Sequence, residues 1–253
     1  MGKNFFVTFF VSIILLSSSY VSAQEEYELF MPSGKMFFTF SWDLALKGDG
    51  IGSKAAIVDG TSDQELKVDW VIAFYSYKNF FIKSGYMFTD STGAYINAGI
   101  TERAFRVDYK KISSPSIDET YLYYQQYYHL EGGCRLNLPN NCYLDFGAYY
   151  GIQKGDMTFT GEDTILTSYE EAKKGDITVE ENDGYKINND FGITASVGTL
   201  YPIIQDAIYF DASFRLIQGL YPAFELVGNT SGDFKWKLYN FSFGLVLGIT
   251  AVF

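Results

Sequence analysis

Apolar side chains recur at every second position through most of the chain beyond residue 34. In the segment 35–46 the even positions are Met, Phe, Phe, Trp, Leu and Leu, whereas the odd positions mix Lys, Phe, Thr, Ser, Asp and Ala. Because successive side chains of a β-strand point to opposite faces, this pattern predicts a strand with one almost wholly apolar face. The pattern recurs in seven further segments, which are 68–74, 80–88, 121–138, 144–152, 190–197, 208–216 and 241–253. The sequence therefore predicts eight strands.

The N-terminal segment has the organisation of a secretory signal peptide. Lys3 precedes an apolar run at 5–16, and Val21-Ser22-Ala23 fits the small-x-Ala rule for cleavage. That run is shorter than the roughly 20 residues that a membrane-spanning helix needs. We therefore expect three regions, which are a signal peptide at 1–23, a short periplasmic segment at 24–34 and a single barrel at 35–253.

The expected connections alternate between short and long. Short connections fall at 77–79, 139–141 and 202–205, and long ones at 47–66, 90–118, 153–185 and 219–233. An even number of strands with short turns on one side and long loops on the other is the layout of a bacterial outer-membrane barrel. One strand face carries most of the Phe and Leu, while the other carries Asp, Lys, Arg, Ser and Gly, which suits an exterior in contact with lipid. The predicted fold class is all-β, an eight-stranded antiparallel transmembrane up-and-down β-barrel with long extracellular loops.

The last segment of the chain carries the most specific pattern. Apolar or aromatic residues stand at every second position back from the terminal residue, and they are Leu245, Leu247, Ile249, Ala251 and Phe253. This pattern resembles the C-terminal assembly signal of outer-membrane proteins. The chain as a whole resembles small OmpA- and OmpX-type barrels, and the segment 129–151 resembles the central hairpin of the outer-membrane β-barrel domain family. The resemblance implies the bacterial outer membrane, contact with its lipid, and passage through periplasmic chaperones to the barrel-assembly machinery. It implies no particular activity.

Charged residues are expected on the inner face of this barrel, which is just wide enough to be filled by side chains. They are Asp43, Asp69, Lys83, Glu131, Arg135, Asp145, Asp211 and Arg215. A three-residue turn at 139–141 would place Arg135 directly opposite Asp145, an arrangement that stabilises paired strands. We interpret the set as a plugged polar core, and the alternative is an ion path gated by these charges.

The same register predicts the state of the two cysteines. Cys134 and Cys142 would face outward with a four-residue offset, which is roughly 13 Å along a strand. Disulfides need a Cα separation of about 4.4–6.8 Å, so we expect two free thiols. The single histidine, His129, is interpreted as an interior residue on the same face as Glu131. No motif of a lipid-modifying enzyme stands out, and we expect no catalytic residue, metal site or cofactor.

The net negative charge of the chain limits the classes of molecule that it can be expected to bind. The chain has 30 acidic residues against 19 basic ones and a net charge of −11, which disfavours nucleic-acid binding. The expected loop 153–185 is strongly acidic, and it suits either a hydrated surface or recognition of a cationic partner. The most favoured role is a non-enzymatic surface protein that stabilises the envelope or presents its loops to an extracellular ligand. A narrow channel of ten strands, with 95–110 supplying the extra pair, is the second hypothesis, and a lipid-modifying enzyme is the third.

Overall fold

The computed structural model describes residues 33–49, 64–69, 71–72, 79–111, 117–161, 177–178, 185–227 and 235–253. The expected signal peptide and most of the expected periplasmic segment lie outside these ranges. The strands are β1 (Met36–Asp49), β2 (Gln64–Asp69), β3 (Val71–Ile72), β4 (Phe80–Met87), β5 (Thr92–Lys111), β6 (Ile117–Leu138), β7 (Cys142–Gly161), β8 (Ile177–Thr178), β9 (Tyr185–Ile187), β10 (Asp190–Ile204), β11 (Ile208–Gly219), β12 (Phe224–Val227), β13 (Lys235–Leu238) and β14 (Asn240–Val252). No helix within the described ranges is long and apolar enough to cross a bilayer.

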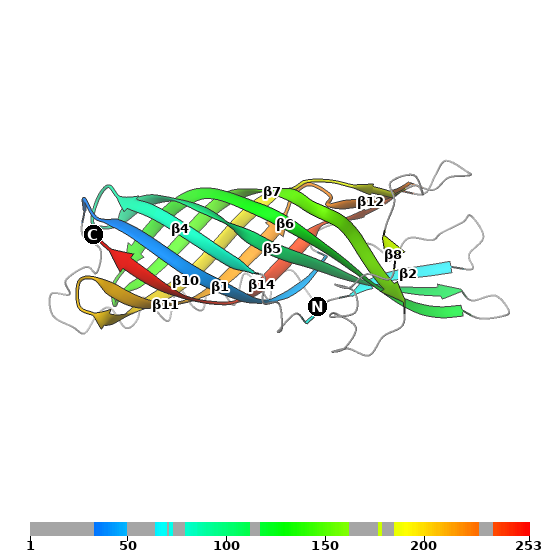
Figure 1. Ribbon diagram of the computed structural model, residues 1–253, viewed down its shortest axis with the longest axis horizontal. Coiled ribbons are helices and arrows are strands. Elements are labelled where there is room, and N and C mark those ends of the chain that lie inside the picture. The colour runs from blue at the N-terminus through cyan, green and yellow to red at the C-terminus, as the bar shows by residue number, and fades with distance from the viewer. Residues whose placement is uncertain are drawn as a thin grey trace.

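Eight of these strands close into an antiparallel barrel (Figure 1). Their order is β10-β11-β14-β1-β4-β5-β6-β7, and the ring is closed by pairing of β7 with β10. The two chain ends of the barrel are also joined, because the Phe253 amide donates to the Met36 carbonyl at 2.9 Å. The predicted fold class is confirmed.

Three tight turns lie at one end of the barrel, at 88–91, 139–141 and 205–207. Asn140, Asn141 and Asp206 adopt positive φ angles of 61°, 58° and 60°, a conformation that Asn and Asp tolerate better than most residues. Backbone hydrogen bonds tie each turn to a neighbouring strand or turn, as from the Val252 amide to the Ala207 carbonyl at 2.8 Å. Because short turns mark the periplasmic side of such barrels, the opposite end is extracellular.

Three predicted elements are wrong, although the number of barrel strands is right. The segment 68–74 is not one of the eight barrel strands. Its described residues belong to β2, which pairs with the extracellular end of β5, and to β3, which pairs with the extracellular end of β1. Conversely, most of the expected loop 90–118 is β5, one of the eight barrel strands. The expected turn at 77–79 is therefore wrong as well, since β1 pairs directly with β4 and the connection between them is long. The ten-strand alternative also fails, because 95–110 belongs to β5.

The hairpin of β6 and β7 has the predicted register. Arg135 pairs with Asp145, Cys134 with Phe146 and Leu138 with Cys142. Both cysteines are free. The three-residue turn and the positions of the apolar residues were sufficient to set this pairing.

The barrel is apolar outside and polar inside. On β1, Phe38 is 44% exposed and Trp42 is 49% exposed, whereas Thr39 between them is 2% exposed. The large exposed side chains include Phe40 and Leu44 on β1, Ile82 and Tyr86 on β4, Leu130 on β6, Phe146 and Ile152 on β7, Ile193 on β10 and Leu245 and Ile249 on β14. Such a belt of exposed apolar side chains around a polar interior is the pattern of a barrel embedded in lipid.

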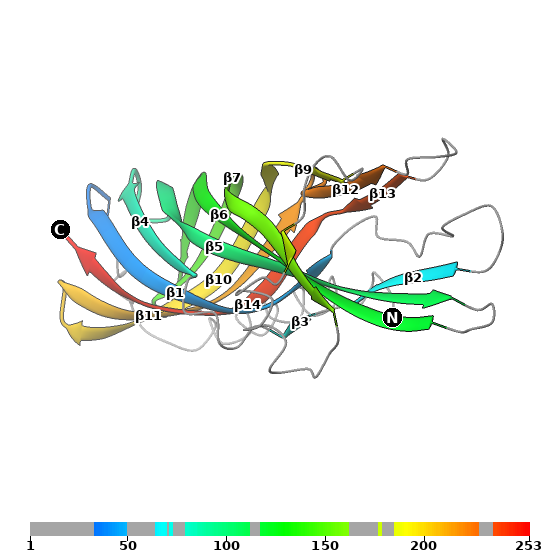
Figure 2. The ribbon, with the colours of Figure 1, turned by 45° about the vertical axis from the view of Figure 1, so that its right-hand side comes forward.

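Three adjacent strands continue well past the length that a bilayer requires. The strands β5, β6 and β7 have 20, 22 and 20 residues, whereas about 9–11 suffice for a transmembrane strand. Because their tight turns are periplasmic, the excess projects on the extracellular side (Figures 1 and 2). There β2 pairs with β5 and β8 pairs with β7, while β9, β12 and β13 form a separate three-stranded sheet.

Candidate functional site

The barrel lumen gathers seven of the eight charged residues that the sequence predicted to face inward. Asp43 lies on β1, Lys83 on β4, Glu131 and Arg135 on β6, Asp145 on β7, and Asp211 and Arg215 on β11. All are buried except Lys83, whose side chain is 14% exposed. The eighth residue, Asp69, is on β2, which is not one of the eight barrel strands. Asp69 pairs with Arg106 of β5, and the structure does not describe its side chain.

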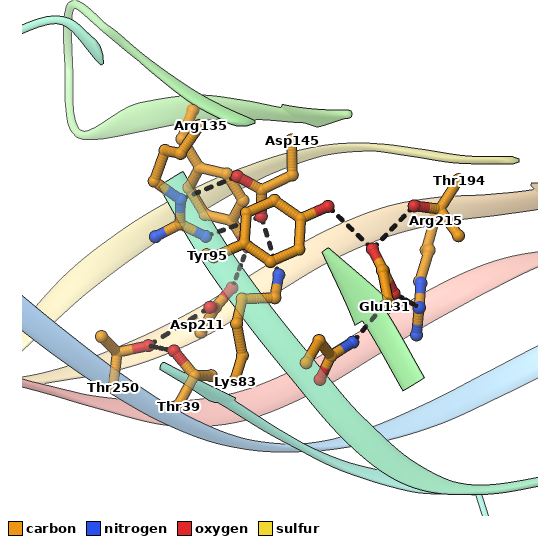
Figure 3. A network of polar contacts seen from close by, with 12 residues as sticks. Thr39, Lys83, Tyr95, Glu131, Arg135, Asp145, Thr194, Asp211, Arg215 and Thr250 are labelled. Carbon is orange, nitrogen blue, oxygen red and sulfur yellow. Dashed lines mark hydrogen bonds and ion pairs between the residues drawn. The ribbon is translucent and has the colours of Figure 1, made fainter. Parts of the chain in front are cut away.

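Asp145 is the centre of the cluster nearest the periplasmic end (Figure 3). Arg135 Nε and Nη2 each donate to one carboxylate oxygen of Asp145 at 2.8 Å, a bidentate pair between neighbouring strands. Lys83 Nζ reaches the same carboxylate at 2.7 Å from β4, a strand that is not adjacent to β7. This contact therefore crosses the lumen.

Two aromatic rings contact the Arg135 guanidinium. Its Cζ atom lies 4.3 Å from the ring centroid of Phe37 and 3.8 Å from that of Tyr143. The Tyr143 hydroxyl donates to Asp211 Oδ1 at 2.6 Å, which again links two strands that are not neighbours. Guanidinium stacking on aromatic faces is favourable when the groups are desolvated.

Glu131 is the centre of a second cluster, farther from the periplasmic end (Figure 3). Its Oε1 accepts hydrogen bonds from the Tyr95 and Thr194 hydroxyls, each at 2.7 Å. Its Oε2 accepts from Asn97 Nδ2 at 3.0 Å and forms an ion pair with Arg215 across the lumen. A buried carboxylate with this many partners is held in one position.

His129 packs against this second cluster. Its Nε2 lies 3.1 Å from Glu131 Oε2, and its ring stacks on Tyr149 at a centroid distance of 4.8 Å. Phe81 contacts the ring edge-on at 5.2 Å. These contacts fix an interior residue, in agreement with the sequence interpretation.

A third cluster, toward the extracellular end, was missed by the sequence reasoning. Arg103 of β5 is 1% exposed, and its Nη1 donates to the Thr101 hydroxyl at 2.5 Å. Asp190 accepts a hydrogen bond from the Tyr149 hydroxyl at 2.8 Å, and it lies 3.8 Å from Arg103 Nε. The inward alternation of β5 could have revealed Arg103, but the segment had been expected to form a loop.

Apolar side chains fill the periplasmic end of the lumen, below the Asp145 cluster. Phe37, Met87, Tyr95, Tyr143, Leu200, Tyr209 and Val252 form one buried cluster. They come from seven of the eight barrel strands, all except β6. This largely apolar layer lies between the polar clusters and the periplasm, and the hydroxyls of its Tyr95 and Tyr143 side chains reach Glu131 and Asp211 of those clusters.

Glycines in the wall make room for the lumenal rings. A Cβ atom at Gly147 would lie 2.7 Å from the Tyr95 hydroxyl and 3.0 Å from Glu131 Oε1. The Tyr95 side chain can thus lie along the inner wall and reach Glu131 of the neighbouring strand β6 only because its path meets a residue without a side chain. No group of three or more His, Cys, Asp or Glu side chains in the described ranges could hold a metal ion.

The closed ring of eight strands, the lipid-facing exterior and the polar interior define this protein as a small outer-membrane β-barrel. It lies in the outer membrane of a bacterium.

Solved structures of similar architecture include three outer-membrane proteins. OprG from Pseudomonas aeruginosa has 13% sequence identity, covers 90% of this chain and 99% of its own, and has a TM-score of 0.37. AlkL, solved in lipid bilayers, has 13% identity over 91% of this chain and 94% of its own, with a TM-score of 0.41. The attachment invasion locus protein Ail of Yersinia pestis has 13% identity over 87% of this chain and 99% of its own, with a TM-score of 0.38. No protein-family model and no curated protein matches the sequence.

Proposed function

We propose that this barrel is a non-enzymatic surface protein whose lumen is plugged and whose extracellular strands and acidic loops recognise a cationic partner. The observation that carries the proposal is the set of polar contacts that cross the lumen between strands that are not neighbours. Lys83 with Asp145 and Arg215 with Glu131 occupy the space that a solute would need. A buried charge that loses its partner is costly, so these contacts oppose opening of the lumen.

The extracellular extension is the part of the molecule that a partner would meet. The register of β2 and β5 places residues of opposite charge at directly opposite positions, pairing Glu65 with Lys110, Lys67 with Asp108 and Asp69 with Arg106. Opposite charges at such positions stabilise paired strands. The ladder thus supports a platform beyond the bilayer, and in the sequence β7 is followed by the remainder of the acidic segment 153–185, whose first residues form the end of that strand.

Binding of a cationic probe tests this recognition. Proteoliposomes with the full chain would be titrated with fluorescent polylysine, using wild type and a Glu162→Gln, Asp163→Asn variant. Since an exposed ion pair contributes about 0.2–1 kcal/mol, we expect the variant to bind at least about twofold more weakly and the difference to vanish at high salt. A matched variant, Asp90→Asn with Asp206→Asn, removes two exposed acids at the periplasmic turns and should bind like wild type. Equal binding by all three proteins would contradict the proposal.

We also propose that the C-terminal residues Leu245, Leu247, Ile249, Ala251 and Phe253 are the signal read by the barrel-assembly machinery. They lie on β14 and at its end, and Leu245, Ile249 and Phe253 are exposed on the lipid-facing side. Deletion of Phe253 should lower the amount of folded protein in the outer membrane while its level in the periplasm rises. An unchanged distribution in fractionated cells would contradict this role.

The narrow channel remains the second candidate for a barrel of this kind. It would need a continuous path past the Asp145 and Glu131 clusters and through the apolar layer at the periplasmic end. We assign the lumenal charges a structural role because each of these two carboxylates is held by partners from several strands.

A further inference from the structure

A wide-open surface cavity of about 410 Å³ lies on the outside of the barrel wall, toward the extracellular end. It is lined by Tyr150, Asn188, Asn189, Phe191 and Tyr221. Tyr150 of β7 and Phe191 of β10 pair directly, and each side chain is 45% exposed on the outer face. The cavity is therefore separate from the lumen and its charge clusters.

The position of the cavity relative to the bilayer follows from the register. The β7–β10 ladder begins at its periplasmic end with the pair Cys142 and Thr199, and Tyr150 is the ninth residue of β7. A tilted strand crosses the hydrocarbon layer in about 9–11 residues. The cavity thus lies at the extracellular boundary of the bilayer, where acyl chains join the polar part of the lipid.

Hydrogen bonds fix the polar residues that line the cavity. Asn189 Nδ2 donates to the Tyr150 hydroxyl at 2.8 Å, and the Gln153 amide donates to Asn189 Oδ1 at 3.1 Å. Asn188 Nδ2 donates to the Pro222 carbonyl at 3.0 Å.

The aromatic walls are also tied to each other. The amides of Leu220 and Tyr221 both donate to the Phe191 carbonyl, at 2.7 and 3.2 Å. These two hydrogen bonds hold the segment after β11 against the start of β10. The cavity is consequently formed before any ligand arrives, which lowers the ordering cost of binding.

The lining is continuous with the surface that contacts lipid. Ile152 and Ile193, exposed by 49% and 48%, are the next outward residues of β7 and β10 beside the lining residues Tyr150 and Phe191. The cavity itself presents ring faces and carboxamides and no charged side chain. This combination fits the upper part of an acyl chain together with its neutral ester or amide linkage.

A cation follows the cavity residues along β7, beyond the extracellular edge of the cavity. Lys154 follows Tyr150 and Ile152 at the next alternate position of β7, and its ammonium lies 5.4 Å from the ring centroid of Tyr128. Lysine side chains near the bilayer boundary extend toward the headgroups and attract anionic lipid. We propose that this cavity is a specific site for one phosphate-bearing lipid of the outer leaflet, with Lys154 as its phosphate contact.

Native mass spectrometry of the refolded full-length protein tests the site, with lipid A, phosphatidylglycerol and phosphatidylcholine as separate probes. Wild type should retain one molecule of a phosphate-bearing anionic lipid after annular lipid has been removed. A Tyr150→Ala, Phe191→Ala variant should bind it at least about tenfold more weakly. The matched control is Phe40→Ala with Ile82→Ala, which removes another directly opposed pair of exposed side chains from a different part of the wall. This control should bind like wild type.

Lys154→Gln keeps the cavity and tests the phosphate contact separately. It should weaken lipid A or phosphatidylglycerol severalfold and leave the weak binding of phosphatidylcholine unchanged. Preference for lipid A over phosphatidylglycerol would identify the lipid as lipopolysaccharide, whereas equal binding would identify a general anionic phospholipid site; both results support the proposal. Equal lipid retention by wild type and both double variants, with each shown to be folded by its heat-dependent gel mobility, would overturn it.

Discussion

Glu131 shows how much of the barrel interior depends on single residues. Its carboxylate receives hydrogen bonds from Tyr95, Asn97 and Thr194 and an ion pair from Arg215. The contacts come from strands on several sides of the lumen, so one side chain ties the wall together.

Replacing Glu131 by Gln should therefore destabilise the barrel strongly. The change keeps the size of the side chain but leaves the Arg215 guanidinium buried without its counter-charge, which costs about 3–5 kcal/mol. Urea unfolding in lipid vesicles measures the loss. Thr194→Val, which removes one hydrogen bond to the same carboxylate, should cost only about 1 kcal/mol. A smaller loss for Glu131→Gln than for Thr194→Val would contradict the role of the ion pair.

Gly147 offers a second test at the same scale. Gly147→Ala should destabilise the barrel by about 1–3 kcal/mol, because its Cβ would overlap the Tyr95 hydroxyl and crowd Glu131. Gly132→Ala is the matched control, since a Cβ there would have its nearest neighbour at 4.0 Å. The same unfolding measurement compares them, and equal stabilities of the two variants would show that the Tyr95 side chain does not need this space.

The sequence determined which charged residues face inward better than it determined their partners. Alternation placed Glu131 and Arg135 on the inner face, and the turn length paired Arg135 with Asp145. The contact of Arg215 with Glu131 joins strands that are far apart around the ring, so it depends on how the sheet closes. Local periodicity contains no information on that closure.

Among the elements, β5 explains why one strand was missed and another was wrongly assigned. The outward positions of β5 include Ala94, Ala98 and the polar Glu102, so its apolar face is weaker than that of β1. The segment 68–74 alternates strongly, yet its described residues belong to the end of β2 and to β3, which pair with the extracellular ends of the ring strands β5 and β1. Alternating polarity indicates that the two faces of a strand lie in different environments. It does not indicate whether that strand is part of the closed barrel.

The register of the β6–β7 hairpin can be tested by a new disulfide. In a Cys142→Ser, Phe146→Cys variant, residue 146 would lie directly opposite Cys134. Directly opposed Cα atoms in antiparallel strands are about 4.5–5.5 Å apart, within the disulfide range. We expect a crosslink after mild oxidation, detected by peptide mass mapping. The native pair Cys134 and Cys142 should remain unlinked under the same conditions, and a bridge between them would show that the register is wrong.

At the scale of the whole molecule, the proposed function assigns separate tasks to the lumen and to the extracellular surface. The lumen is crossed by buried polar contacts and ends in an apolar layer at the periplasmic side. The strands β5, β6 and β7 carry the chain well beyond the bilayer, where β2 and β8 join them. The central claim of the proposed function is that a barrel built in this way serves as a rigid support for an extracellular surface.

Single-channel recording of the refolded protein in a planar bilayer tests that claim most directly. Wild type should give no conductance steps, because Lys83, Arg135 and Asp145 hold the lumen closed above the apolar layer. A Lys83→Ala, Arg135→Ala variant recorded beside it shows whether these residues line any path that does exist. Steady open currents in wild type, with an ion selectivity altered by the two substitutions, would contradict a plugged lumen and identify the protein as a channel.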